Sequence, residues 1–145
     1  MNRKLRTTLA LTAIGGVGLG LGYAASDANA AGGFTATGTT PSESGPFVTG
    51  RGTVEEFVPR TTARVVYSVA LFRQLPSEAR ARRMVVRNSS ISFAATRGTL
   101  QVFAACRRTG SASWSVGVGY RVFNRQGRVI GSDFRLSRAV SLRCR

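Results

Sequence analysis

Apolar and polar residues alternate in two runs between residues 99 and 123, and this alternation limits the possible folds more than any other feature of the chain. A period of two places every second side chain on one face of an extended strand. The apolar residues of the two runs are Leu100, Val102, Ala104 and Cys106, then Trp114, Val116, Val118, Tyr120 and Val122. The polar segment 107–111 between them has the length of a hairpin turn. We therefore predict a β-hairpin at the centre of a small all-β domain.

Shorter runs predict the remaining strands. Residues 54–58 indicate a short edge strand that ends at Pro59, residues 61–72 a central strand, and residues 128–130 and 133–145 the last one or two strands. In residues 84–95 the apolar phase changes, which predicts a bulge or break at residues 88–90. Residues 74–83 break the β pattern and indicate a basic crossover loop with a helical turn.

About six to seven short strands with frequent turn signals are typical of a small antiparallel β-sandwich. The set Cys106, Trp114 and Cys144 resembles the cysteines and tryptophan of the immunoglobulin-like sandwich. The order is wrong for an antibody-type domain, because the second cysteine there is usually farther away and not at the chain end, so the resemblance extends to the architecture only. The sequence predicts this architecture and indicates no family.

The N-terminal residues have the features of an export signal. A basic start precedes an apolar stretch over residues 9–22, and Ala28 and Ala30 are small residues of the kind that a signal peptidase recognises. We predict a removable signal peptide over residues 1–30, with a membrane anchor as the alternative. Residues 31–52, rich in Gly, Thr and Ser, predict a flexible leader, and residues 53–145 the β-sandwich domain. The expected location is outside the cell or at its envelope.

The two cysteines favour one structural disulfide in an exported domain. A bridge from Cys106 to Cys144 would stabilise the domain by roughly 4 kcal/mol in the chain-entropy model. The alternatives are two free thiols, or an intermolecular bridge through Cys144.

Positive charge dominates the chain, with 21 basic and 6 acidic residues. Without residues 1–30, 18 arginines stand against 5 carboxylates, a net charge of about +13. Guanidinium groups pair with phosphate and sulfate through two hydrogen bonds, so anionic polymers or cell-envelope components are the expected partners. The predicted anion-binding residues are Arg80, Arg82, Arg83 and Arg87, with a second group at Arg107 and Arg108. Solvated surface charge is the alternative interpretation.

The residue types argue against catalysis. The chain has no histidine, and its two cysteines lack metal-site spacing, so we predict neither an enzyme nor a cofactor or metal. No two of the remaining carboxylates form a recognisable motif. They are Glu43, Glu55, Glu56, Glu78 and Asp133.

Three functions remain open at this point. The first is a secreted non-enzymatic binding module for anionic polymers or surfaces. The second is a protease inhibitor presenting an arginine from residues 75–83 or 107–111, and the third is a protein-interaction domain using Phe103, Phe123 and Tyr120. We expect Phe103 and Phe123 to lie in the core. Gly117 and Gly119 leave a lane along their strand that either a neighbouring side chain or a ligand would fill.

Overall fold

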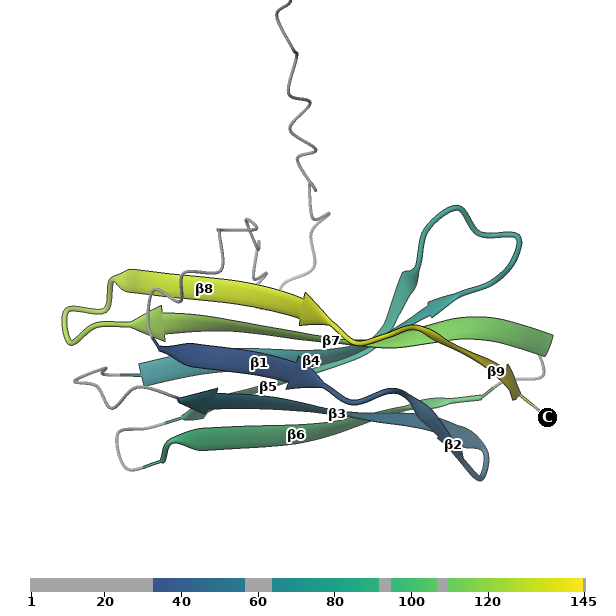
Figure 1. The fold of residues 1–145 in the computed structure, drawn as a ribbon, viewed down its shortest axis with the longest axis horizontal. Helices are drawn as coiled ribbons and strands as arrows, with labels where there is room; N and C mark the ends of the chain where they lie inside the picture. The colour runs from purple at the N-terminus through teal and green to yellow at the C-terminus, as the bar shows by residue number, and fades with distance from the viewer. Residues whose placement is uncertain (1–32, 57–63, 92–94, 107–109, 145) are drawn as a thin grey trace, which may run out of the picture.

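Two antiparallel sheets pack face to face as a β-sandwich (Figure 1). The computed structural model describes residues 33–56, 64–91, 95–106 and 110–144. The first sheet contains β1 (Phe34–Gly38), β2 (Ser42–Ser44), β3 (Phe47–Glu56) and β6 (Arg97–Ala105). The second sheet contains β4 (Arg64–Gln74), β5 (Arg82–Ile91), β7 (Gly110–Phe123), β8 (Val129–Leu136) and β9 (Val140–Cys144). The predicted all-β sandwich is confirmed.

Two long strands, β3 and β7, each pair along one side with two short strands in succession. β1 and β2 pair with successive parts of β3, and β8 and β9 pair with successive parts of β7. Pro41 lies between β1 and β2, where it cannot donate to a ladder. Between β8 and β9, Ser137 keeps the chain on β7, because its N–H donates to the Val116 carbonyl at 2.8 Å and its Oγ accepts from the Val116 N–H at 2.9 Å.

The core lies between the sheets and follows the predicted alternation. Val65, Tyr67, Val69 and Leu71 of β4 are buried, and so are the alternate residues of β7 from Trp114 to Val122. Val102 and Ala104 of β6 close the core from the first sheet, while Leu100 and Cys106 pack at its margin. The expected apolar faces are therefore confirmed, and β4 is central, between β5 and β7.

The predicted hairpin is wrong, because its two strands lie in different sheets. β6 pairs with β3, whereas β7 pairs with β4, β8 and β9. Alternation identifies the buried face of a strand and leaves its partner undetermined. Both apolar faces still contribute side chains to the same core, each from its own sheet.

The structure also differs from the predicted flexible leader over residues 31–52, because β1, β2 and most of β3 lie within residues 34–52. β3 is moreover the central strand of the first sheet, where an edge strand over residues 54–58 was expected. Its inward residues are Val48, Gly50, Gly52 and Val54, so two glycines hide the alternation. A Cβ at Gly52 would lie 2.5 Å from Val69 Cγ2 and 2.6 Å from Val118 Cγ2. The glycines are needed because the facing sheet approaches closely.

The signal-peptide prediction falls outside the described residues.

The β4–β5 connection is an antiparallel hairpin in place of the predicted helical crossover. Residues 75–81 form its loop, in which the Glu78 N–H donates to the Leu75 carbonyl at 3.0 Å. β5 continues through residues 88–90 without the predicted break. The irregularity lies instead at Met84, because Leu71 pairs with Val85 and Phe72 with Arg83.

Aromatic rings cover the lane that the β7 glycines leave on the outer face of the second sheet. A Cβ at Gly117 would lie 2.6 Å from Phe72 Cε2 and 2.8 Å from Phe134 Cζ. Side-chain packing, the first of the two alternatives, is thus confirmed at Gly117, and the lane there is not a ligand groove.

Candidate anion-binding surface

The β4–β5 hairpin brings together four of the six predicted anion-binding residues. Arg80 lies in its loop, Arg82, Arg83 and Arg87 lie on β5, and all four are exposed. In the described part of the chain, β5 pairs only with β4 and is an edge strand. Residues 73–87 contain five arginines and one carboxylate, that of Glu78, which gives this segment a net charge of +4. Arg107 and Arg108 lie outside the described residues.

Glu78 holds the loop of this hairpin in shape. Its Oε2 accepts the Leu75 N–H at 2.9 Å, its Oε1 lies 2.8 Å from Arg82 Nε, and its backbone carbonyl accepts from Gln74 Nε2 at 3.0 Å. The Glu78 side chain is only 14% exposed, whereas that of Arg82 is 71% exposed. The single carboxylate therefore organises the loop from within and leaves the arginines at the surface.

Arg87 has a structural role in addition to its charge. Its Nη1 donates to the Gln101 carbonyl of β6 at 3.1 Å, which joins the edges of the two sheets. Arg51, opposite Gln101, uses its own N–H and carbonyl with Thr39, so the Gln101 carbonyl points to the open edge of the sheet. Arg87 thus covers an exposed strand edge, a usual function of edge charges.

Sequence reasoning missed Arg73, which the structure adds to this cluster. Arg73 lies directly opposite Arg82 of β5 and Trp114 of β7. It follows Val65, Tyr67, Val69 and Leu71 at the same spacing, so its position on the inward face was readable from the alternation. Arg73 Nε and Trp114 Nε1 are both buried and have no hydrogen-bond partner within the described ranges of the chain.

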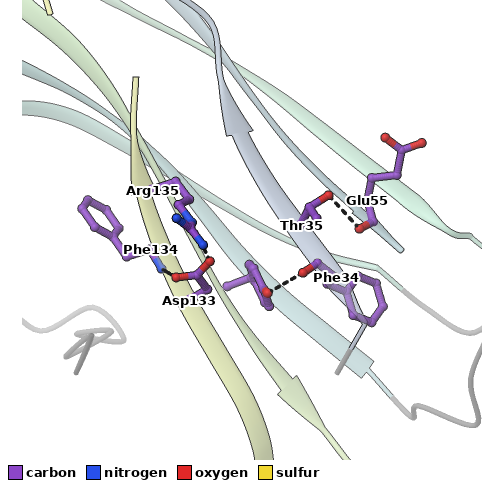
Figure 2. A network of polar contacts seen from close by, with 7 residues as sticks. Phe34, Thr35, Glu55, Asp133, Phe134 and Arg135 are labelled. Atoms are coloured by element: carbon purple, nitrogen blue, oxygen red, sulfur yellow. Dashed lines mark hydrogen bonds and ion pairs between the residues drawn. The ribbon is translucent and has the colours of Figure 1, made fainter. Parts of the chain in front are cut away.

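The carboxylates do not gather into an acid–base pair in the described residues. Glu55 and Glu56 are neighbours on β3 and point to opposite faces. Asp133 accepts from Arg135 Nε and from the Phe134 N–H, each at 2.8 Å (Figure 2). No group of three or more His, Cys, Asp or Glu residues able to hold a metal occurs in this part of the chain.

Tyr120, which lies opposite Asp133 in the ladder, belongs to the core. It donates from Oη to the Phe34 carbonyl at 2.7 Å, a contact that links β7 to β1 across the sandwich (Figure 2). Burial, and secondarily the Asp133 charge, raise the pKa of Tyr120 above its usual value, against a lowering by Arg135. A buried Tyr120 is not free to contact a protein partner.

Phe103 is placed contrary to expectation, on the outer face of the first sheet. It is 53% exposed, and its ring centroid lies 5.7 Å from that of Phe47 in an edge-to-face arrangement. Phe123 is half-buried, and Arg64 lies over its ring at 5.0 Å. The expectation that Phe103 lies in the core is wrong, because its neighbours at every second position face solvent on that side of β6.

Cys106 directly follows β6, lies at the margin of the core and is not a free thiol. Its N–H donates to the Pro46 carbonyl at 2.7 Å. The side chain of Cys144 lies outside the described residues, so the Cys106–Cys144 pairing stays a prediction.

The described residues contain no helix that is long and apolar enough to cross a membrane. No protein-family model matches the chain, and no curated protein matches it. One solved structure is similar over 76% of this chain and 14% of its own, the β-glucosidase from Kluyveromyces marxianus in complex with glucose. The identity is 8% and the TM-score 0.38, so this likeness carries no argument about function.

Proposed function

We propose that this protein is an exported, non-enzymatic binding module for anionic polymers or surfaces at the cell envelope, and that the β4–β5 hairpin makes the contact. The observation that carries the proposal is the charge of residues 73–87, where five arginines accompany one glutamate already engaged within the loop. Guanidinium groups on an exposed edge strand are well suited to phosphate, sulfate or carboxylate groups repeated along a polymer.

The geometry favours a polymer over a single small ion for the outer arginines. Arg83 and Arg87 are four residues apart on β5, with the bulge at Met84 between them, so their backbones are separated by up to roughly 13 Å. This distance exceeds the Debye length of about 8 Å at physiological ionic strength, so each arginine would meet a separate charged group. Binding of this type should weaken steeply as salt is raised.

The test is elution of the protein from heparin and from isolated cell-wall polymer along a salt gradient. The Arg80→Ala/Arg82→Ala/Arg83→Ala variant is compared with Arg97→Ala/Arg128→Ala/Arg138→Ala, which removes the same charge from exposed positions on other elements. We expect the first variant to elute at clearly lower salt than the control. Equal shifts in both variants, or elution of the unaltered protein at low salt, would contradict a localised surface. Thermal melts verify that both variants fold.

A second candidate function is protease inhibition, which one observation favours. The Glu78 contacts pre-shape the loop that presents the exposed Arg80, and a rigid loop lowers the cost of binding to a protease. An inhibitor would slow a trypsin-like protease and resist cleavage at Arg80. In a binding module, the same loop would be cleaved without inhibition, and Glu78→Ala would accelerate the cleavage.

A further inference from the structure

Three donor side chains form one row across the second sheet, on its inward side. Arg82 of β5, Arg73 of β4 and Trp114 of β7 lie directly opposite one another in the ladders. Directly opposed residues of an antiparallel pair point to the same face, so the three side chains share a face. Trp114 is 1% exposed, Arg73 is half-buried, and Arg82 is exposed, so the row runs from the core to the surface.

Two members of this row have buried donors that are not satisfied. Neither Arg73 Nε nor Trp114 Nε1 has a hydrogen-bond partner among the residues that the structure describes. An unpaired buried donor costs about 1–3 kcal/mol, and native proteins pair nearly all of them. Two such donors on directly opposed residues therefore indicate an acceptor that the described part of the chain does not supply.

The charges in the row indicate that the acceptor is an anion. Arg73 and Arg82 place like charges directly opposite each other, which is destabilising. Glu78 compensates the charge of Arg82, because Glu78 Oε1 lies 2.8 Å from Arg82 Nε, but no ion pair involves Arg73 among the described residues. Arginine and tryptophan side chains donate hydrogen bonds and accept none, so only an acceptor satisfies both.

We propose that Arg73 and Trp114 form a subsite for one oxyanion, a sulfate, phosphate or carboxylate group. The oxyanion accepts from the Arg73 guanidinium and from Trp114 Nε1, and Arg82 attracts it at the surface. This inference rests on the proposed anion binding and adds to it a single inner site for one charged group of the polymer. The exposed Arg80, Arg83 and Arg87 bind the other charged groups of the polymer.

Trp114 is the only tryptophan, so its indole N–H gives one isolated NMR resonance that reports on the subsite. The ¹⁵N-labelled protein is titrated with sodium sulfate, sodium phosphate and sodium acetate, with sodium chloride added to hold ionic strength constant. A heparin tetrasaccharide in a parallel titration distinguishes a polymer-borne group from a free ion. We expect a saturable shift of the indole resonance. Arg73→Gln should weaken the binding about tenfold or more, since it removes a charge-assisted hydrogen bond.

Arg128→Gln is the matched control, because Arg128 is an exposed arginine in the β7–β8 turn. Arg73→Gln removes one of two opposed like charges, so it should fold, and a thermal melt verifies this. Trp114→Phe keeps an aromatic ring and removes the donor. Sulfate should raise the melting temperature of Trp114→Phe less than that of the unaltered protein, because a ligand stabilises the fold in proportion to its affinity.

The subsite is overturned if none of the probes moves the indole resonance, or if Arg73→Gln and Arg128→Gln respond alike. These outcomes are distinct from failure of the proposed function. Retention on polymers without a Trp114 response contradicts the subsite alone. A Trp114 response to sulfate in a protein that polymers do not retain supports the subsite and contradicts the polymer function.

Discussion

At the residue scale, the close approach of the two sheets depends on glycines that face inward from β3. The positions nearest to a Cβ at Gly52 are Val69 and Val118, whose side chains are themselves fully buried. They have no space into which to move, because protein interiors are close-packed. Gly52 is therefore a packing requirement, and its freedom of backbone conformation plays no part.

Gly52→Ala should destabilise the domain by about 1–3 kcal/mol, the usual effect of overpacking a core. Urea unfolding measures the change, with Arg51→Ala as the control, since Arg51 is the exposed neighbour on the same strand. If Gly52→Ala and Arg51→Ala unfold at the same urea concentration, the assigned sheet contact is wrong.

Tyr120 makes stability sensitive to alkaline pH. Its pKa is raised in the folded state, mainly by burial, above the value of 10.0 expected for the unfolded chain. The folded protein therefore keeps this proton while the unfolded chain loses it. The contribution of Tyr120 is complete below pH 10 and is lost as the pH rises through the folded-state pKa.

Tyr120→Phe should cost about 1–3 kcal/mol at neutral pH, because the buried Phe34 carbonyl loses its donor. The difference in unfolding free energy between the two proteins should narrow above pH 10. There, deprotonation of Tyr120 in the unfolded chain favours unfolding of the unaltered protein, and the Tyr120→Phe variant lacks this effect. Urea unfolding from pH 7 to pH 11 tests this expectation, and a difference that stays constant over this range would contradict it.

At the scale of the elements, the sequence predicts which faces of the strands are buried better than which strands are neighbours. The faces of β4 and β7 follow from alternation alone. Only the last residues of β3 are predicted as a strand, because its inward Gly50 and Gly52 carry no apolar side chain. The predicted pairing of β6 with β7 is wrong because a short polar segment also fits a connection between sheets.

The candidate site shows the same division. Charge and proximity in sequence identify Arg80, Arg82 and Arg83 as a group. The row formed with Arg73 and Trp114 depends on cross-strand register, which joins residues about 10 and 40 positions apart and has no local signal. The bulge at Met84 also shifts the register by one residue, and this determines which residue of β5 lies opposite Arg73.

The predicted disulfide would act between elements of the two sheets. Cys106 follows β6 in the first sheet, and Cys144 ends β9 in the second. Replacing both cysteines by alanine should lower stability by roughly 4 kcal/mol, because the unfolded chain then loses a long closed loop. Differential scanning calorimetry measures this effect. A melting temperature unaffected by the double substitution would exclude an intramolecular bridge of structural importance.

At the scale of the whole molecule, the distribution of acidic residues makes the positive charge uneven. Glu43, Glu55 and Glu56 lie in the first sheet, and Asp133 lies on β8. The β4–β5 hairpin has Glu78 alone against five arginines in residues 73–87, which concentrates positive charge at its end of the second sheet. A polyanion should therefore approach the domain there first.

The most direct test of this account is an NMR titration of the ¹⁵N-labelled protein with a short heparin fragment, followed at every backbone amide. We predict that the largest shifts fall within residues 73–87, on the loop and first half of β5. Shifts of similar size around Arg51, Arg97, Arg128 and Arg138 would show that the fragment senses only diffuse charge, and would contradict the assignment of binding to the β4–β5 hairpin.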